Sequence, residues 1–275
     1  MPHVDDVTTE SIADSSGQSP RLEPVVISAP FGNYIQPEGT TPTLGTFTLH
    51  RRPGRLWRIL KTVRYRPKHK AWVNRIGLRN PGIDWLIHRV QRGRCNVTDK
   101  IISIHGFDDA QWYALLDKIA TVQPLAVELN MSCPNVGEID WPGDLFERAI
   151  GTGVPVIVKL PPIRYEQMLE QAIDAGVRCF HCCNTLPVPE GGMSGKPLQP
   201  VSLGVIRDLR RRPMGQNLTL IGGGGIYELA DIDRYLEAGA DHVALGTKTM
   251  NPVYLLTHAG LRPMIRYAHQ RLGCR

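Results

Sequence analysis

The stretch from Val127 to Val136 combines groups that could do chemistry with an abrupt end to an apolar segment. If it begins as a strand, period-two alternation places Glu128 and Asn130 on one face, opposite the apolar side chains. Pro134 then ends the strand, because proline has no N–H for the sheet ladder. Cys133 would stand just past the strand's carboxyl end, where its thiolate could remove a proton from a planar ligand held by neighbouring amides. The alternative is a buried, inert thiol.

A lysine ends a second apolar strand, because Lys159 follows three β-branched residues at 156–158. Burying an unpaired ammonium group costs several kcal/mol, so it needs a partner. We therefore expect Lys159 either to face an anionic or acceptor-rich ligand, or to form an ion pair with Glu128 on the neighbouring strand.

Polar residues and glycines follow the other predicted strands as well. In a parallel barrel the carboxyl ends of all strands open at one mouth, so these residues belong together. Glycines 222–225 and the pair Gly246-Thr247 follow the seventh and eighth strands, where barrels bind phosphate on backbone N–H groups. The full set is Asn33, Asn74, Asn130, Cys133, Asn135, Lys159, Asn184, Thr185, Gly223, Gly224, Gly225, Gly246 and Thr247. It predicts one ligand site with an anion-binding end.

The chain alternates apolar strand segments with amphipathic helical segments, the pattern that would bring these residues to one place. We predict strands at 25–29, 45–49, 101–105, 125–131, 154–160, 177–183, 218–222 and 241–245, and helices at 108–122, 143–151, 164–175, 200–212, 227–238 and the C-terminus. Eight strands in βα order favour an α/β fold, a (β/α)8 TIM barrel. An open doubly wound sheet is the alternative, but no Gly-x-Gly-x-x-Gly turn follows the first strand.

The length of 275 residues suits a single domain of this kind. Residues 1–20 are polar and lack apolar periodicity, so we expect a disordered tail there and one barrel domain over 21–275. No apolar run approaches the roughly 20 residues that span a bilayer, and the N-terminus lacks a signal-peptide pattern. We expect a cytoplasmic protein without a membrane partner.

The six cysteines lack the spacing of a disulfide framework, which indicates a reducing compartment. Cys179, His181, Cys182 and Cys183 resemble a set of metal ligands. On a strand, however, Cys182 would face away from the other three, so the four cannot surround one ion without help from elsewhere. We therefore expect small buried residues here and no metal site.

The net charge of +6 and the pI near 9.1 depend on one segment rich in arginine and lysine. Its basic residues are Arg51, Arg52, Arg55, Arg58, Lys61, Arg64, Arg66, Lys68 and Lys70. Trp57 and Tyr65 lie among them, and such a mixture could bind RNA or a phosphate group. We interpret the segment as a solvated surface excursion without nucleic acid, followed by a glycine-punctuated ligand loop at 71–82.

Five motifs of the chain together resemble the FMN-dependent dihydroorotate dehydrogenases. They are ELNMSCPN, VKLPP, the Asn184-Thr185 pair followed by GGMSGKPL, IGGGGI and AGADHVALGT, with SAPFGN, GTFTL and VNRIGLRNPG as looser matches. The resemblance runs from about residue 24 to residue 255. It implies an FMN-binding (β/α)8 barrel that oxidises dihydroorotate to orotate in pyrimidine biosynthesis.

The resemblance also implies roles for individual residues, by their positions in the motifs. Cys133 would be the general base that removes the proton from C5 of dihydroorotate while C6 gives hydride to flavin N5. The pyrimidine would be bound by Asn74, Asn130, Asn135, Asn184 and Thr185, with the backbone N–H groups of Gly77 and Leu78 at its carboxylate. FMN would be bound by Ala29, Asn74, Lys159, Gly195, Gly224, Gly225, Gly246 and Thr247.

Two departures from the family pattern concern the substrate. Family members carry an additional active-site lysine where this chain has Asn33 or Gly45, and the segments after Cys133 and Thr185 are short. Two alternatives therefore stay open: a flavin barrel of the tRNA dihydrouridine synthase kind, which has a similar N-M-x-C-P stretch, and a flavin-binding barrel without catalysis. The sequence also leaves open a homodimer and the electron acceptor, which is fumarate, NAD through a partner subunit, or a quinone.

Overall fold

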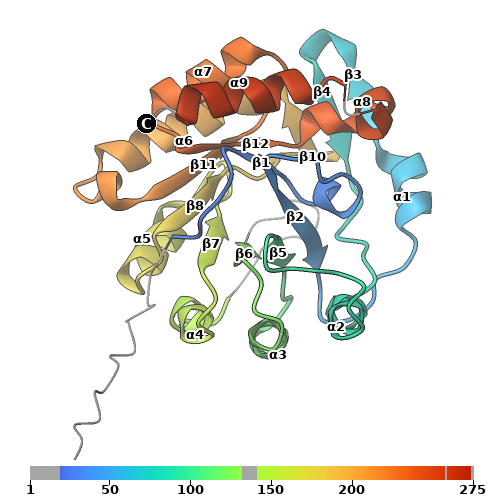
Figure 1. Cartoon of the computed structure of the whole chain (residues 1–275), viewed down its shortest axis with the longest axis vertical. Coiled ribbons are helices and arrows are strands. Elements are labelled where there is room, and N and C mark those ends of the chain that lie inside the picture. Colours follow the sequence, from blue (N-terminus) through green and yellow to red (C-terminus); the bar gives the residue numbers. More distant parts are fainter. Residues whose placement is uncertain (1–18, 132–140, 258, 274–275) are drawn as a thin grey trace, which may run out of the picture.

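The computed structural model describes residues 19–131, 141–257 and 259–273 (Figure 1). Within these ranges, eight parallel strands close into a barrel in the order β1-β12-β11-β8-β7-β6-β5-β2. The strands are β1 (Val25–Ile27), β2 (Thr40–Phe47), β5 (Ile101–Ile104), β6 (Ala126–Asn130), β7 (Val156–Lys159), β8 (Cys179–Cys182), β11 (Thr219–Gly223) and β12 (His242–Leu245). The predicted TIM barrel is confirmed.

The second strand begins five residues earlier than the predicted 45–49. Its first residues, Thr40 to Pro42, pair in parallel with Val25 to Ile27 of β1. Proline, glycine and threonine are frequent in this part of the chain, and their composition indicated a link instead of a strand.

The barrel interior has an apolar layer and a polar layer above it. The apolar layer comes from seven of the eight strands and consists of Val26, Ile101, Ala126, Ile157, Cys179, Ile221 and Ala244. Because strand side chains alternate in direction, the residues two positions further along four of these strands also face inward. These are Ser103, Glu128, Lys159 and His181, all buried. The strands therefore carry charged groups up to the carboxyl end of the barrel.

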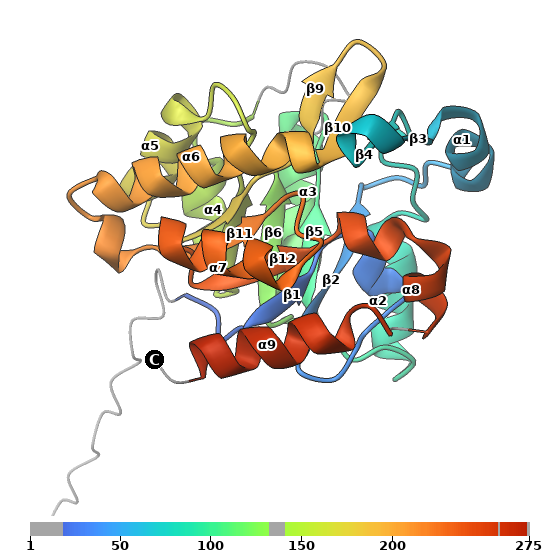
Figure 2. The same ribbon diagram turned by 90° about the horizontal axis from the view of Figure 1, so that it is seen from above.

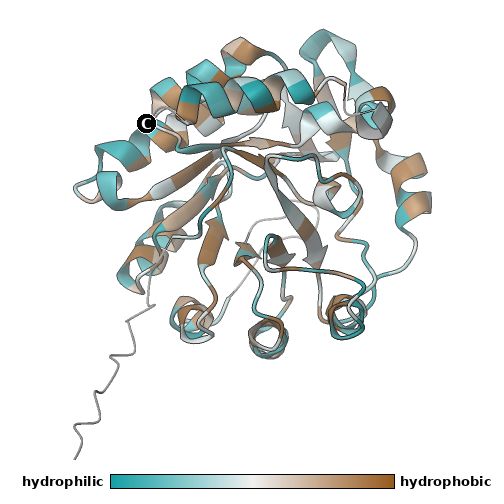
Figure 3. Cartoon of the chain, in the orientation of Figure 1, coloured by the Kyte–Doolittle hydropathy of each residue, from teal (hydrophilic) through white to brown (hydrophobic). Residues whose placement is uncertain are grey.

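Helices surround the barrel, and Figures 1 and 2 show them on its outer side. They are α2 (Ile83–Gln91), α3 (Asp109–Ala120), α4 (Leu145–Gly151), α5 (Glu166–Asp174), α6 (Gln199–Arg211), α7 (Leu229–Ala238) and α9 (Arg262–Leu272). Their apolar side chains pack on the strands, while hydrophilic positions gather on the outer faces (Figure 3). Five internal helices and the terminal helix match the prediction, whereas α2 was not predicted.

A second sheet, which the sequence analysis missed, stands beside the barrel in Figure 2. It has the antiparallel order β3-β4-β10-β9, formed by β3 (Arg64–Arg66), β4 (Ala71–Asn74), β9 (Leu186–Val188) and β10 (Gly191–Gly195). The prediction of a loop at 71–82 was therefore wrong for its first four residues. Its central pair, β4 and β10, joins residues more than a hundred positions apart, and such a pairing leaves no local pattern, which explains the omission.

Two short helices complete the described elements, α1 (Arg55–Thr62) and α8 (Pro252–Thr257). The basic segment thus contains a helix, a strand of the second sheet and a short 3-10 turn at Pro67–His69. Leu56, Trp57 and Leu60 of α1 are exposed. The segment is a surface excursion, as expected, but an ordered one.

Other expectations concern the ends of the chain, the membrane and the cysteines. Residues 1–18 lie outside the described residues, so the disordered tail and the single domain over 21–275 stay predictions. In the described part of the chain, no helix has both the length and the apolar character needed to cross a membrane. Four described cysteines, Cys95, Cys179, Cys182 and Cys183, have free thiols.

Candidate active site

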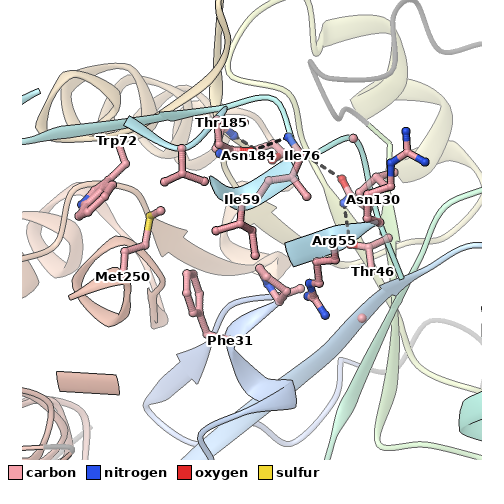
Figure 4. A pocket seen from close by; sticks show the side chains of 18 of the residues that line it. Phe31, Thr46, Arg55, Ile59, Trp72, Ile76, Asn130, Asn184, Thr185 and Met250 are labelled. Carbon is pink, nitrogen blue, oxygen red and sulfur yellow. Dashed lines mark hydrogen bonds between the residues drawn. The ribbon is translucent and has the colours of Figure 1, made fainter. Parts of the chain in front are cut away.

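The carboxyl ends of the barrel strands open into a pocket of about 550 Å³ (Figure 4). This volume is typical of sites for small ligands and cofactors. The barrel contributes Thr46, Asn130 and Lys159, whereas Ile59 comes from α1 and Trp72 from β4. The remaining lining residues are Ala29, Pro30, Phe31, Tyr34, Gly45, Arg55, Val63, Asn74, Ile76, Gly77, Leu78, Arg79, Asn184, Thr185, Thr249 and Met250. In Figure 4, Trp72 and Met250 lie at one end of the pocket and Asn130 and Thr46 at the other.

Many of the residues that the sequence analysis singled out meet in this pocket. The lining includes eight of them: Ala29, Asn74, Gly77, Leu78, Asn130, Lys159, Asn184 and Thr185. Cys133 and Asn135 lie outside the described residues, in the gap that begins two residues after Asn130. The roles given to all of these residues stay predictions.

The predicted phosphate-binding residues Gly195, Gly224, Gly225, Gly246 and Thr247 do not belong to the pocket lining. Backbone contacts nevertheless bring β10 and the loop after β11 together. A Cβ on Gly225 would lie 2.6 Å from the Gly195 carbonyl oxygen, and Gly224 and Gly225 both have positive φ angles of 116° and 66°. These backbones pack directly against each other and leave no room for side chains, which explains the glycines at both positions.

A chain of hydrogen bonds orients the amides at the polar end of the pocket. Asn184 Nδ2 donates to Asn130 Oδ1 at 2.8 Å, and Asn130 Nδ2 donates to Thr46 Oγ1 at 2.8 Å. Thr46 in turn lies 2.9 Å from the Ser103 hydroxyl, and the Asn184 side-chain oxygen accepts from the Thr185 N–H at 2.8 Å. Since each amide has its direction fixed by a neighbour, the pocket offers a preset pattern of donors and acceptors.

A buried cluster of three ionisable residues lies beneath these amides. Glu128 accepts a hydrogen bond of 2.7 Å from His181 Nδ1, and its other oxygen lies 3.9 Å from Lys159 Nζ. Burial by itself would raise the pKa of Glu128, but the Lys159 ammonium and His181 together lower it to about 2. Burial, with the nearby Lys159 charge, lowers the pKa of His181. At neutral pH the carboxylate is therefore ionised and the imidazole is neutral.

The two alternatives for Lys159 prove to be compatible. Lys159 pairs with Glu128 and also lines the pocket, and a separation of 3.9 Å is too long for a hydrogen bond. The N–H groups of the ammonium thus remain able to bind an acceptor in the pocket. His181, which had entered a set of metal ligands by its sequence spacing, is instead the partner of Glu128. No group of His, Cys, Asp or Glu side chains with metal-binding geometry exists among the described residues.

The two positions at which family members would carry a further lysine have structural roles here. Asn33 donates to the Pro30 and Gly45 carbonyl oxygens at 2.8 and 2.9 Å and accepts from the Gly45 N–H at 3.2 Å. Asn33 thus ties a turn to β2 and is not among the pocket-lining residues, and its place in the predicted ligand set stays a prediction. Gly45 lines the pocket, but a Cβ there would lie 2.4 Å from the Ser103 carbonyl oxygen.

Several lining residues escaped the sequence analysis, among them Arg55, Ile59, Val63 and Arg79. Arg55 and Ile59 are four residues apart and share one face of α1, and Val63 follows directly after the helix. This spacing was a usable signal in the basic segment. Arg79 lies in the motif VNRIGLRNPG, in which only Asn74, Gly77 and Leu78 had been predicted to bind a ligand.

Comparisons with known proteins agree with this architecture. The family model described as dihydroorotate dehydrogenase matches residues 39–258. The dihydroorotate dehydrogenase B (NAD(+)) catalytic subunit of Oceanobacillus iheyensis is 34% identical over 64% of this chain and 66% of its own length. The catalytic subunit of the same name from Listeria welshimeri is 30% identical over 66% of this chain and 68% of its own.

Two solved structures have a fold similar to that of this chain. The ligand-free DHODH of Eimeria tenella superposes with a TM-score of 0.71 at 18% identity, covering 90% of this chain and 83% of that one. The same enzyme in complex with ferulenol gives a TM-score of 0.67 at 17% identity, with 91% and 82% covered. These identities support the fold alone, whereas the family match extends over most of the sequence. The chain belongs to the dihydroorotate dehydrogenase family of oxidoreductases.

Proposed function

We propose that the protein binds FMN and oxidises dihydroorotate to orotate in pyrimidine biosynthesis. One observation carries the proposal: the ordered amides of Asn130 and Asn184 stand beside Lys159 at the mouth of a barrel of this family. A planar pyrimidine presents alternating N–H and C=O groups along its edge, which amide side chains can match. The names of the relatives, catalytic subunits of dihydroorotate dehydrogenase B, point to the same substrate.

The residues present fit FMN. Gly195, Gly224, Gly225, Gly246 and Thr247 would hold its phosphate, because Gly224 and Gly225 follow β11 and Gly246 and Thr247 follow β12, the strand ends at which barrels bind phosphate on backbone N–H groups. Gly195 packs against Gly225 at the same place. Ala29, Asn74 and Lys159 line the pocket in which the ring would lie. When bound, the flavin supplies the acceptor for a hydride.

Cys133 is the general base of the proposed reaction. It lies outside the described residues, but the chain enters that segment from β6, whose last residue, Asn130, lines the pocket. The thiolate would take the proton from C5 of dihydroorotate, and bound FMN would supply the acceptor for the hydride from C6, so that the C5–C6 double bond of orotate could form. Because an ordinary thiol has a pKa near 8.5, the base is mostly protonated at neutral pH.

The test is anaerobic stopped-flow measurement of flavin bleaching by dihydroorotate. We expect Cys133→Ala to keep its FMN and lose about 10²-fold to 10⁴-fold in rate, the contribution of a positioned base. Cys95→Ala is the matched control, since Cys95 is a free and partly exposed thiol outside the pocket lining. A Cys133→Ala protein that bleaches at the parental rate would remove this residue from the mechanism. If the flavin-loaded parent is never bleached by dihydroorotate, the proposal that dihydroorotate is the substrate fails.

The partners remain proposals too. We expect a small-molecule pyrimidine substrate and no nucleic acid or membrane. The named relatives are catalytic subunits, so we propose that electrons pass from the flavin to a partner subunit. The homodimer and the cytoplasmic location stay predictions of the sequence.

A further inference from the structure

The pocket carries positive charge beyond Lys159. Among the residues that the structure describes, its charged lining residues are Arg55, Arg79 and Lys159, with no aspartate or glutamate beside them. Lys159 has Glu128 as its buried counter-ion. Neither arginine forms an ion pair with any carboxylate in the described part of the chain. The described part of the lining therefore has an excess of two cations.

Backbone contacts bring the segments of the two arginines side by side. The N–H of Arg52 donates to the Asn80 carbonyl oxygen at 2.9 Å, and the N–H of Asn80 donates back to Arg52 at 3.1 Å. Arg79 Nη1 donates to the Pro53 carbonyl oxygen at 3.3 Å, two residues before Arg55. The two arginines thus enter the pocket lining from neighbouring segments of the chain.

Arg79 has a donor that the protein leaves unsatisfied. Its Nε is buried and has no hydrogen-bond partner, and a buried donor in this state normally calls for a ligand or an ion. The side chain of Asn80 fixes the backbone around it, accepting from the N–H groups of Thr48 and Gly82 and donating to the Leu78 carbonyl oxygen at 2.8 Å. The position of Arg79 is therefore held in place without help from a charge partner.

Arg55 stands where helix formation alone would not favour a cation. It is the first residue of α1, whose first turn contains no acidic residue, and the helix dipole opposes a positive charge at this end. Its guanidinium lies over the ring of Tyr34, 5.2 Å from the ring centre, and both residues line the pocket. Figure 4 shows its side chain projecting among the lining residues, next to Thr46 and Asn130 in this view.

We infer that Arg55 and Arg79 form an anion subsite that binds the carboxylate of a planar heterocyclic acid. The inference rests on the proposed function and adds residues to it. A Cβ at Gly45 would collide with the Ser103 carbonyl oxygen, and Asn33 is engaged in hydrogen bonds to Pro30 and Gly45, so this chain supplies the charge from α1 and from the loop after β4. A guanidinium matches a carboxylate with two parallel N–H donors, and the backbones of Gly77 and Leu78 lie in the same lining.

The test is calorimetric titration of the FMN-loaded protein with two pairs of ligands. Orotate and uracil differ by one carboxylate, and nicotinate and nicotinamide differ by a carboxylate and a neutral amide. We expect Arg55→Gln and Arg79→Gln each to raise the Kd for orotate and for nicotinate by about 10-fold to 100-fold. A loss of this size corresponds to one charge-assisted hydrogen bond. Uracil and nicotinamide should bind as before, and flavin content should not change. Arg55→Lys, which keeps the charge, should restore part of the loss.

Arg51→Gln is the matched control, because Arg51 is an exposed arginine four residues from Arg55 and outside the lining. If Arg55→Gln and Arg79→Gln both bind orotate and nicotinate as tightly as the parent does, the inference is overturned. A parent that prefers neither carboxylate over its neutral counterpart, including one that binds none of the four ligands, overturns it as well. A parent that binds nicotinate through both arginines but not orotate would keep the subsite and contradict dihydroorotate as the substrate.

Discussion

Replacing Glu128 with glutamine removes the charge on which the buried group in the barrel depends. The carboxylate pairs with Lys159 at 3.9 Å and with His181 at 2.7 Å, and all three side chains are at most 8% exposed. Glutamine keeps the shape of the side chain but leaves the Lys159 ammonium without a counter-ion. Breaking a buried pair in this way is strongly destabilising.

The magnitude follows from the pKa of Glu128, which is about 2 compared with an ordinary value of 4.5. At roughly 1.4 kcal/mol for each pKa unit, the interactions of the ionised form contribute about 3 kcal/mol to the free energy of unfolding. With an unfolding entropy of about 2.1 cal/mol/K per residue, a loss of this size lowers the Tm of a 275-residue protein by about 5 °C.

The effect has a defined pH dependence. A carboxyl group whose pKa is lower in the folded state stabilises the protein above the unfolded pKa, and this contribution disappears as the pH falls towards the folded pKa. The difference between the parent and Glu128→Gln should therefore be largest at pH 7. It should fall to about half by pH 3.

Urea unfolding of both proteins between pH 3 and pH 7, followed by circular dichroism, measures this difference. Asp84→Asn is the control, because Asp84 pairs with Lys118 at 2.7 Å on the surface, with 60% of its side chain exposed. An exposed pair is worth about 1 kcal/mol or less, so this variant should stay close to the parent. A Glu128→Gln protein with parental stability at pH 7, or with the parental dependence on acid, would refute the reasoning.

Three further predictions concern the cofactor, the base and the basic segment. Gly225→Ala should reduce the FMN content of the purified protein, measured by absorbance, because its Cβ would lie 2.6 Å from the Gly195 carbonyl oxygen. Gly153 has a similar φ of 73° but open space around it, so Gly153→Ala should keep the parental FMN content. The rate of flavin reduction by dihydroorotate should rise about tenfold for each pH unit below the pKa of the Cys133 thiol, and a flat profile in stopped-flow measurements would contradict a thiolate base. The basic segment 51–70 should bind tRNA weakly in filter assays, whereas tight binding with a steep salt dependence would favour a uridine-reducing enzyme.

The sequence by itself determined the barrel and the direction of its inner side chains. Alternation along the strand at 126–130 placed Glu128 and Asn130 on the inner face, and the lysine at the end of the next strand had to share that face. These inferences held because side-chain direction in a strand is a local property with a period of two residues. The same periodicity located the carboxyl ends of the strands, and hence the side of the barrel on which the pocket opens.

Only the tertiary structure decided which side chains share the pocket beyond the strand ends. The pairing of β4 with β10 joins residues 71–74 to 192–195, and the contact between Arg52 and Asn80 joins the segment before α1 to the loop that carries Arg79. The hydrogen bonds of Asn33 to Pro30 and Gly45, which tie a turn to β2, are of the same kind. Contacts between segments distant in the sequence depend on the complete packing of the chain, and no local pattern of residue types records them.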